Sequence, residues 1–125
     1  MRKRNPDQAF RPQYYRYRRS AKVREIDWQL TLPQFVEMAK QYCAYCNAPP
    51  RDYKSRLKRG RGAEVITLMN GIDRVNSDIG YIEYNCVPCC STCNMMKMTL
   101  TGGDFIEQVM KIYHYYAKLQ NEDND

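Results

Sequence analysis

Six cysteines in three Cys-x-x-Cys pairs constrain the fold of this 125-residue chain more than any other feature of its sequence. The pairs are Cys43 with Cys46, Cys86 with Cys89, and Cys90 with Cys93. This spacing is typical of half of a zinc site, and two such halves bind one zinc ion with four thiolates. The first pair supplies one half, and the spacing leaves either of the other two pairs as the second.

Three disulfides are the alternative use of six cysteines. The N-terminal segment MRKRNPDQAF lacks the apolar region of a secretion signal, and no run approaches the roughly 18 apolar residues of a membrane span. We therefore expect a reducing compartment, no membrane association and free thiols that can bind metal. The length predicts one domain with a modest core, which a structural metal would stabilise.

The two halves of the chain carry opposite charge. Residues 1–62 contain 16 Lys or Arg against 5 Asp or Glu, whereas residues 63–125 contain 4 against 9. A basic half beside a half rich in carboxylates is the distribution that a metal-dependent nuclease needs. The alternative is a basic segment that is simply solvated.

Basic and aromatic side chains alternate near the N-terminus. Pro6 and Pro12 predict an extended, flexible arm, and the unbroken run from Gln13 to Glu25 predicts a basic helix. Arginine can bind phosphates through two hydrogen bonds, and tyrosine can stack on a base. The candidate nucleic-acid-binding residues here are Arg16, Arg18 and Arg19. Alternatively, the tyrosines pack on the domain and the arginines only face water.

A second basic segment, RDYKSRLKRGRG, spans residues 51–62. Its charges and glycines predict an exposed, mobile loop that follows a nucleic-acid backbone. Its candidate binding residues are Arg56, Lys58, Arg59 and Arg61.

Local signals predict two elements around these segments. Thr31 and Gln34 form a capping box, with Pro33 in the first turn, that starts a helix ending near Gln41. The composition of residues 64–68, EVITL, predicts a strand.

Downstream, residues 72–75 and 81–84 predict the two strands of a hairpin around a turn at residues 76–80. Cysteine-rich turns and a short helix from about residue 92 to residue 97 follow.

A last helix is predicted from residue 105 to about residue 119, capped by Asp104. We expect its core face to contain Phe105, Ile106, Val109, Met110, Ile112 and Tyr113. The acidic tail at residues 120–125 is predicted to be disordered.

Three side chains with oxygen ligands accompany the cysteine pairs: Asp73, Asn85 and Asn94. Carboxylate and amide oxygens suit a hard ion such as Mg²⁺ and not zinc. We therefore expect a structural metal and a catalytic one.

Together, these motifs resemble the HNH endonucleases of the His-Me finger (ββα-metal) superfamily. The resemblance covers roughly residues 21–113 and rests on Cys43-x-Tyr-Cys46, Gly71-Ile-Asp-Arg74, Gly80-Tyr81 and Asn85-Cys-Val-Pro-Cys-Cys90-Ser-Thr-Cys93-Asn94-x-x-Lys97. It implies an α+β fold, with a small zinc-stapled ββα-metal core and flanking helices. The expected single domain, 1–125, comprises a basic arm and helix start (1–20), the core (21–113) and the acidic tail (120–125).

The resemblance also implies roles for individual residues. Zinc would be bound by Cys43, Cys46, Cys90 and Cys93. Asp73 matches the metal-binding acid and Asn94 the final Mg²⁺ ligand, while Asn85 matches the central asparagine that ties the hairpin loop to the strand. Cys86 and Cys89 would then be small buried residues.

Arg74 stands where most HNH enzymes have the histidine that activates water, an Asp-Arg pattern that the resemblance places among zinc-containing phage and restriction-type variants. Arginine cannot act as a base because its pKa stays above about 12, so we expect Arg74 to contact the scissile phosphate. Tyr45 is the candidate base. The alternatives are a packing role for Tyr45, a base role for Tyr81 or Tyr84, and a metal-bound hydroxide. The single histidine, His114, is expected on the surface.

The predicted function is metal-dependent hydrolysis of phosphodiester bonds in double-stranded DNA. The alternative is a catalytically inactive, zinc-stapled nucleic-acid-binding protein, which would have no use for both Asp73 and Asn94. We expect a cytoplasmic location in a bacterial or phage-infected cell and a restriction, homing or phage DNA-processing role, with homodimer formation left open.

Overall fold

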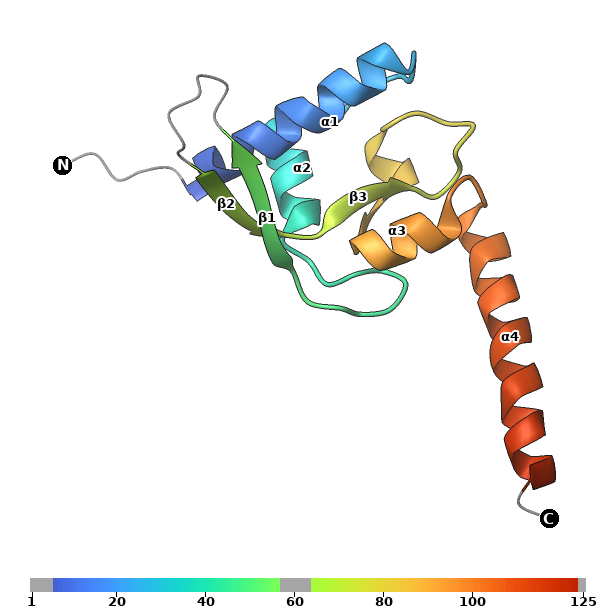
Figure 1. The fold of residues 1–125 in the computed structure, drawn as a ribbon. Helices are drawn as coiled ribbons and strands as arrows, with labels where there is room; N and C mark the ends of the chain where they lie inside the picture. The colour runs from blue at the N-terminus through green and yellow to red at the C-terminus, as the bar shows by residue number, and fades with distance from the viewer. Residues whose placement is uncertain (1–5, 57–63, 124–125) are drawn as a thin grey trace.

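The computed structural model describes residues 6–56 and 64–123 and has the expected α+β architecture, with helices around two separate two-stranded sheets (Figure 1). The elements in chain order are η1 (Pro6–Phe10), α1 (Arg11–Val23), α2 (Leu32–Ala39), β1 (Arg51–Arg56), β2 (Glu64–Met69), β3 (Gly71–Arg74), η2 (Glu83–Asn85), β4 (Cys86–Cys89), α3 (Ser91–Lys97) and α4 (Gly102–Asp123), where η denotes a 3₁₀ helix. No helix in the described part of the chain has the length and apolar character needed to cross a membrane.

Aromatic rings hold α1 and α2 together. Phe35 of α2 is fully buried and makes edge contacts, at 5.5 Å between centroids, with the rings of Tyr14 and Tyr17 from α1. The Tyr14 hydroxyl donates a hydrogen bond of 2.8 Å to the carbonyl of Leu30, which satisfies its polar atom inside the core. These two tyrosines therefore pack on the domain, as one of the two alternatives for this segment expected.

The extended arm predicted from Pro6 and Pro12 is wrong where the structure describes it. Residues Pro6–Phe10 form η1, and α1 already begins at Arg11 with proline in its first turn, where a missing N–H costs nothing. Phe10 is buried in the same core as Phe35. Burial of this ring draws the segment onto the domain.

The mobile loop predicted for residues 51–62 is wrong for its first half. Arg51–Arg56 form β1, which pairs antiparallel with β2 from Arg51 opposite Met69 to Arg56 opposite Glu64. A strand such as β2 needs a partner for its backbone groups, and the polar segment before it supplies one. Lys58, Arg59 and Arg61 lie outside the described residues.

The hairpin has a different second strand from the one predicted. β3 pairs antiparallel with β4, Gly71 opposite Cys89 and Arg74 opposite Cys86, so residues 81–84 are not the returning strand. The backbone of Tyr81 instead accepts a hydrogen bond from Gln29 and donates one to Asp27, both at 2.8 Å. These bonds commit residue 81 to another segment, and the strand that leads into α3 forms later. Strands β3 and β4 with α3 make the expected ββα unit.

The capping box at the start of α2 is present. The Gln34 N–H donates to the Thr31 hydroxyl at 3.3 Å, and the Thr31 N–H donates to the Gln34 side chain at 2.9 Å. We expect Thr31→Ala to lower the free energy of unfolding by about 1 kcal/mol, since one N–H of the first turn loses its acceptor. Urea denaturation measures this, with Thr31→Ser, which keeps the hydroxyl, as the control. An alanine variant as stable as the serine variant would contradict the role of the cap.

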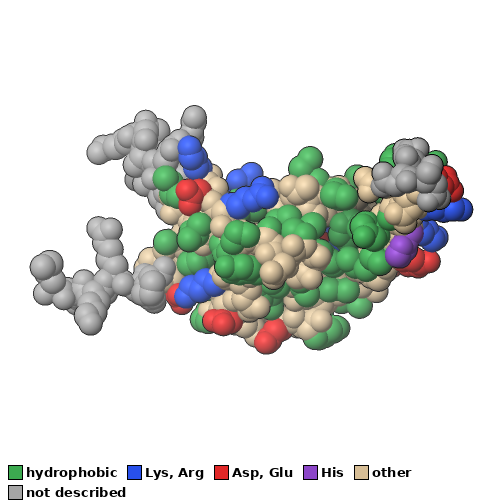
Figure 2. Space-filling model, turned by 90° about the horizontal axis from the view of Figure 1, so that it is seen from below, with side chains coloured by type: hydrophobic (Ala, Val, Ile, Leu, Met, Phe, Trp, Pro, Cys, Tyr) green, Lys and Arg blue, Asp and Glu red, His purple; other side chains and the backbone are tan. Residues whose placement is uncertain are grey.

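The last helix, α4, projects away from the rest of the molecule (Figure 1). Phe105 is buried and Val109 partly buried, but the other expected core residues are exposed by 40–62%: Ile106, Met110, Ile112 and Tyr113. The predicted core face is therefore wrong for these four residues, and of the six expected core residues Phe105 and Val109 are the two that pack against the domain. Figure 2 shows that hydrophobic side chains also gather on the face of the molecule seen from below.

The disorder predicted for residues 120–125 is wrong as far as Asp123, where α4 ends. No glycine or proline follows Gly103, so no residue in the sequence interrupts the helix before this point.

Candidate metal sites and active-site cleft

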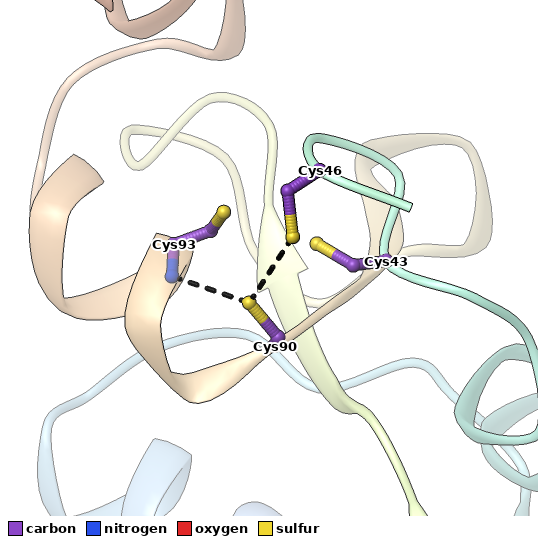
Figure 3. A group of neighbouring side chains, drawn as sticks. All are labelled: Cys43, Cys46, Cys90 and Cys93. Atoms are coloured by element: carbon purple, nitrogen blue, oxygen red, sulfur yellow. Dashed lines mark hydrogen bonds between the residues drawn. The ribbon is translucent and has the colours of Figure 1, made fainter. Parts of the chain in front are cut away.

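Four thiols from two distant segments meet beside the ββα unit (Figure 3). The Sγ atoms of Cys43, Cys46, Cys90 and Cys93 all lie within 4.8 Å of one another, and those of Cys46 and Cys90 are 3.6 Å apart. A tetrahedral zinc site with Zn–S bonds of about 2.3 Å has sulfur–sulfur edges of about 3.8 Å. The cluster therefore has the composition and dimensions to bind a zinc ion.

Local backbone geometry aims the four thiols. The N–H of Asn47 donates to the carbonyl of Cys43 at 2.8 Å, and Asn47 has a positive φ of 63°, a conformation that asparagine tolerates. On the other side, Cys90 caps α3, and its Sγ accepts the N–H of Cys93 at 3.4 Å. Each Cys-x-x-Cys pair thus forms a tight turn whose two sulfurs face the other pair.

Within the four-thiol cluster, the pKa of Cys43 is lowered and the pKa of Cys93 is raised. Burial raises the pKa of Cys43, but backbone N–H groups of Cys90, Cys46 and Tyr45 outweigh it and lower that pKa to about 6. Burial raises the pKa of Cys93, and the neighbouring thiols raise it further. Four thiolates this close together therefore need a cation.

Cys86 and Cys89 are buried outside the four-thiol cluster. Burial raises the pKa of Cys86 to about 12 and raises that of Cys89 as well, so both remain protonated thiols at neutral pH. The sequence left this pair and the Cys90–Cys93 pair as equal candidates for the second half of the site. The geometry brings the latter pair to Cys43 and Cys46.

A second cluster surrounds the carboxylate of Asp73, on β3. Asp73 is 5% exposed, and its Oδ2 accepts a hydrogen bond of 2.9 Å from the hydroxyl of Tyr45. The ammonium group of Lys97, fully buried on α3, lies 3.3 Å from the same Oδ2 and donates to the carbonyl of Arg74 at 3.0 Å. Side chains from the turn at residues 43–46 and from α3 therefore meet at one carboxylate on β3.

Lys97 was not predicted as a site residue. It follows Cys93 by four positions, which places both side chains on one face of a helix. That spacing could have indicated that Lys97 points inward.

Tyr45 keeps its proton in this arrangement. Burial, and then the hydrogen bond to Asp73, raise the pKa of the Tyr45 phenol above its ordinary range. Its ring also packs edge-on against Phe105, with centroids 5.4 Å apart. The hydroxyl thus acts as a donor to Asp73, and the ring has the packing contact that was the alternative for Tyr45.

Arg74 is held by the loop that follows β3. Its Nη1 donates to the carbonyls of Ser77 and Ile79 at 2.7 and 3.2 Å, and its guanidinium lies 5.3 Å from the centre of the Tyr81 ring. Its charge therefore has a fixed position between this loop and the Tyr81 ring.

Asn85 closes the same loop. Its Nδ2 donates to the carbonyls of Asn76 and Gly80, both at 3.0 Å, and its Oδ1 accepts the N–H of Asn76 at 3.0 Å. These are the side-chain bonds expected of an asparagine that ties the loop to the strand. Gly80 is required here, because an added Cβ would lie 2.5 Å from the carbonyl oxygen of Asp27.

A cleft of about 470 Å³ lies between α1 and the ββα unit. Asp73, Arg74 and Asn94 line it together with Arg16 of α1 and Arg24, the residue that follows the last residue of α1. Four of the site residues predicted from the sequence therefore line one cleft: Arg16, Asp73, Arg74 and Asn94. Tyr45 and Asn85 are not among the described lining residues. Tyr45 hydrogen-bonds to Asp73, and Asn85 hydrogen-bonds to the loop after β3.

Other predicted binding residues are placed differently. Arg18 and Arg19 are exposed on α1 but are not among the described residues that line the cleft, and nothing is described of the Arg56 side chain. Arg24 was not predicted. Arg24 follows Arg16 by eight positions, a helical spacing that could have indicated that both side chains lie on the same side of the molecule. His114 is exposed on α4, as expected.

Comparisons with known proteins give the fold. No protein-family model matches the chain. "Uncharacterized protein R423" of Acanthamoeba polyphaga mimivirus is 36% identical over 109 residues, which are 87% of this chain but 18% of that protein, so the chain spans less than a fifth of that relative. The solved structure of the rare-cutting HNH restriction endonuclease PacI, reported for its mechanism of DNA perturbation, has a TM-score of 0.54, with 20% identity, over 90% of this chain and 82% of that chain. The chain therefore has an HNH-like fold.

Proposed function

We propose that this protein is a metal-dependent HNH endonuclease of the Asp-Arg type that hydrolyses phosphodiester bonds of double-stranded DNA. The observation that carries the proposal is the shared cleft, where Asp73, Arg74 and Asn94 of the ββα unit face the basic helix α1. The carboxylate and the amide offer oxygen ligands, and the arginines offer charge for a phosphate.

The proposal includes two metal ions, one structural and one catalytic. The four cysteines would hold a structural zinc ion that joins the turn at residues 43–46 to α3. Asp73 and Asn94 would hold Mg²⁺ or a similar divalent ion, which when bound polarises the P–O bonds of the scissile group.

The protein's own residues position the substrate and the carboxylate. Arg74, fixed by the loop carbonyls, places a permanent positive charge where negative charge develops on the phosphate. Asn85 keeps that loop in place. Lys97 and Tyr45 orient Asp73 from two sides.

Tyr45 bears most directly on the proposed base. The phenol is protonated at neutral pH and gives its hydrogen to Asp73, so we assign Tyr45 first to orienting that carboxylate. We expect Tyr45→Phe to lower Mg²⁺-dependent cleavage by about 10–100-fold, the range for loss of a residue that supports a metal ligand. Cleavage rates measured over a series of Mg²⁺ concentrations test this, with Tyr115→Phe, an exposed tyrosine on α4, as the control.

The outcome separates the roles of Tyr45. A loss that high Mg²⁺ reverses supports orientation of Asp73. A loss of about 10²-fold or more that persists at saturating Mg²⁺ assigns the base role to Tyr45. An unchanged rate would contradict both roles and leave Tyr81, Tyr84 and a metal-bound hydroxide as the candidates for the base.

Plasmid digestion tests the proposed function. We expect zinc-loaded protein to convert supercoiled plasmid to open-circular or linear DNA only when Mg²⁺ is added. Omitting Mg²⁺ is the better control than a chelator, because a chelator would also remove zinc. Zinc content measured after the reaction confirms that the structural site stayed intact.

The buried ion pair of Asp73 with Lys97 favours the second candidate, an inactive zinc-stapled nucleic-acid-binding protein, because Lys97 already neutralises the carboxylate. DNA binding without cleavage by zinc-loaded protein, in Mg²⁺ or Mn²⁺, would support this candidate and reject the nuclease. Homodimer formation, the cellular compartment and a restriction, homing or phage DNA-processing role remain predictions.

A further inference from the structure

One face of α1 forms a wall of the cleft. Its lining residues are Gln13, Arg16, Tyr17 and Ser20, and Arg24, the C-cap residue after the helix, extends this row. They follow one another at intervals of one, three or four positions, which place the four helical residues on a single face. The remaining basic residues of α1 project elsewhere.

This wall is fixed to the strand that carries Asp73. The N–H of Ile72, the residue before Asp73, donates to the Tyr17 hydroxyl at 3.4 Å. A Cβ at Gly71 would lie only 2.5 Å from the same hydroxyl, so α1 packs directly against the backbone of β3. Arg16 lies on this helix and Arg24 directly follows its last residue, so the positions of both relative to Asp73 are set.

The charge of the cleft suits a polyanion. Three of its lining residues are arginines, and Asp73 is the one acidic residue among the described residues that line it. Lys97 already pairs with that carboxylate. Exposed arginines on a rigid helix bind phosphates through paired hydrogen bonds.

The spacing of Arg16 and Arg24 fits the backbone of one DNA strand. The N–H of Arg24 still donates to the carbonyl of Ser20, as in a helical turn, so eight positions at the helical rise separate the two arginines by about 12 Å along the axis. Successive phosphates of a strand advance about 3.4 Å along the duplex, so about 12 Å corresponds to three or four nucleotides.

We propose that Arg16 and Arg24 bind two phosphates of the DNA strand that lies in the cleft, about three or four nucleotides apart. This makes α1 the element that sets the path of the strand past Asp73. The inference rests on the proposed function for the choice of DNA as the polyanion, and DNA binding can be tested without cleavage.

The test compares two double variants that each remove two positive charges from α1 and its C-cap. Arg16→Gln/Arg24→Gln removes two positive charges that line the cleft. Arg11→Gln/Lys22→Gln removes two exposed positive charges outside the cleft. Binding to a short DNA duplex, without divalent ions, is measured by fluorescence anisotropy at several salt concentrations. Circular dichroism and zinc content verify that both variants are folded.

We expect the cleft variant to lose about tenfold or more in affinity and to reduce the slope of log K against log salt by about 1.8, since each lost phosphate contact changes it by about 0.9. The control variant should keep the wild-type slope. Equal changes in both variants, or none in the cleft variant, would overturn the inference.

A second pair of variants tests the inference in case the first double variant misfolds. Ser20→Glu adds one negative charge to the cleft face, whereas Lys22→Gln removes one positive charge outside it, so the net change is equal. Weaker binding in Ser20→Glu alone supports the inference, and equal binding in the two contradicts it. If the slopes behave as expected but no variant or wild-type protein cuts DNA, the inference stands and the proposed nuclease function fails.

Discussion

Cys90→Ser should abolish binding of the proposed structural zinc and unfold the domain. Zinc binding in small zinc domains contributes about 10–16 kcal/mol, which matches or exceeds the whole stability of a typical domain, about 5–15 kcal/mol. Cys90 also caps α3 through its Sγ, so its loss affects both the metal site and the helix that carries Asn94 and Lys97. Zinc analysis, near-ultraviolet circular dichroism and thermal denaturation measure the result.

Cys86→Ser is the matched control, because Cys86 is also a buried cysteine but lies outside the four-thiol cluster. It should keep its zinc and lose only the about 1–3 kcal/mol that burial of an unpaired hydroxyl costs. If purified protein contained no zinc, or if the Cys86 variant lost zinc while the Cys90 variant kept it, the assignment of the metal ligands would be wrong.

Asn94→Ala should reduce Mg²⁺-dependent cleavage by more than the about 10–100-fold that loss of a supporting residue costs, because Asn94 is a proposed ligand of the ion itself. Asn94 is exposed at the cleft, so its replacement should leave zinc content and stability close to wild type. Single-turnover cleavage measures the loss, with Asn121→Ala on α4 as the control. Cleavage by Asn94→Ala at the wild-type rate would place the catalytic ion elsewhere.

Asp73 needs a different design, because its carboxylate is the partner of the buried ammonium group of Lys97. Asp73→Ala would leave that charge unpaired, which costs about 3–5 kcal/mol and confuses stability with catalysis. The double variant Asp73→Asn/Lys97→Met removes both charges together. It should stay folded with bound zinc but be inactive, and activity in this variant would show that the negative charge of Asp73 is not needed for cleavage.

Some features of the protein depend only on residues close together in the sequence, and these could be predicted. The capping box joins Thr31 and Gln34 across three positions, and the positive φ of Asn47 follows a two-cysteine turn. A hairpin followed by a short helix was also predictable, because turn residues and helix signals are local properties of the chain. The α+β class with a ββα-metal core was instead implied by the resemblance to the HNH endonucleases.

Pairing between distant segments could not be derived this way. Composition alone does not determine that β1 pairs with β2, or that β4 and not residues 81–84 returns along β3, because hydrogen bonds from residues 27–29 compete for Tyr81. The choice between the two downstream cysteine pairs was likewise open from spacing. Which sulfurs come within reach of Cys43 depends on where β4 ends and α3 begins.

The composition of the site was decided by packing. The sequence pattern identified Asp73 and Asn94, but only the folded chain brings Lys97 and Tyr45 to the carboxylate and Arg24 to the cleft. The apolar stripe of α4 shows the same division, since its periodicity is fixed by the sequence while its exposure is not. A helical period determines which side chains share a face, and only the positions of other elements determine what that face contacts.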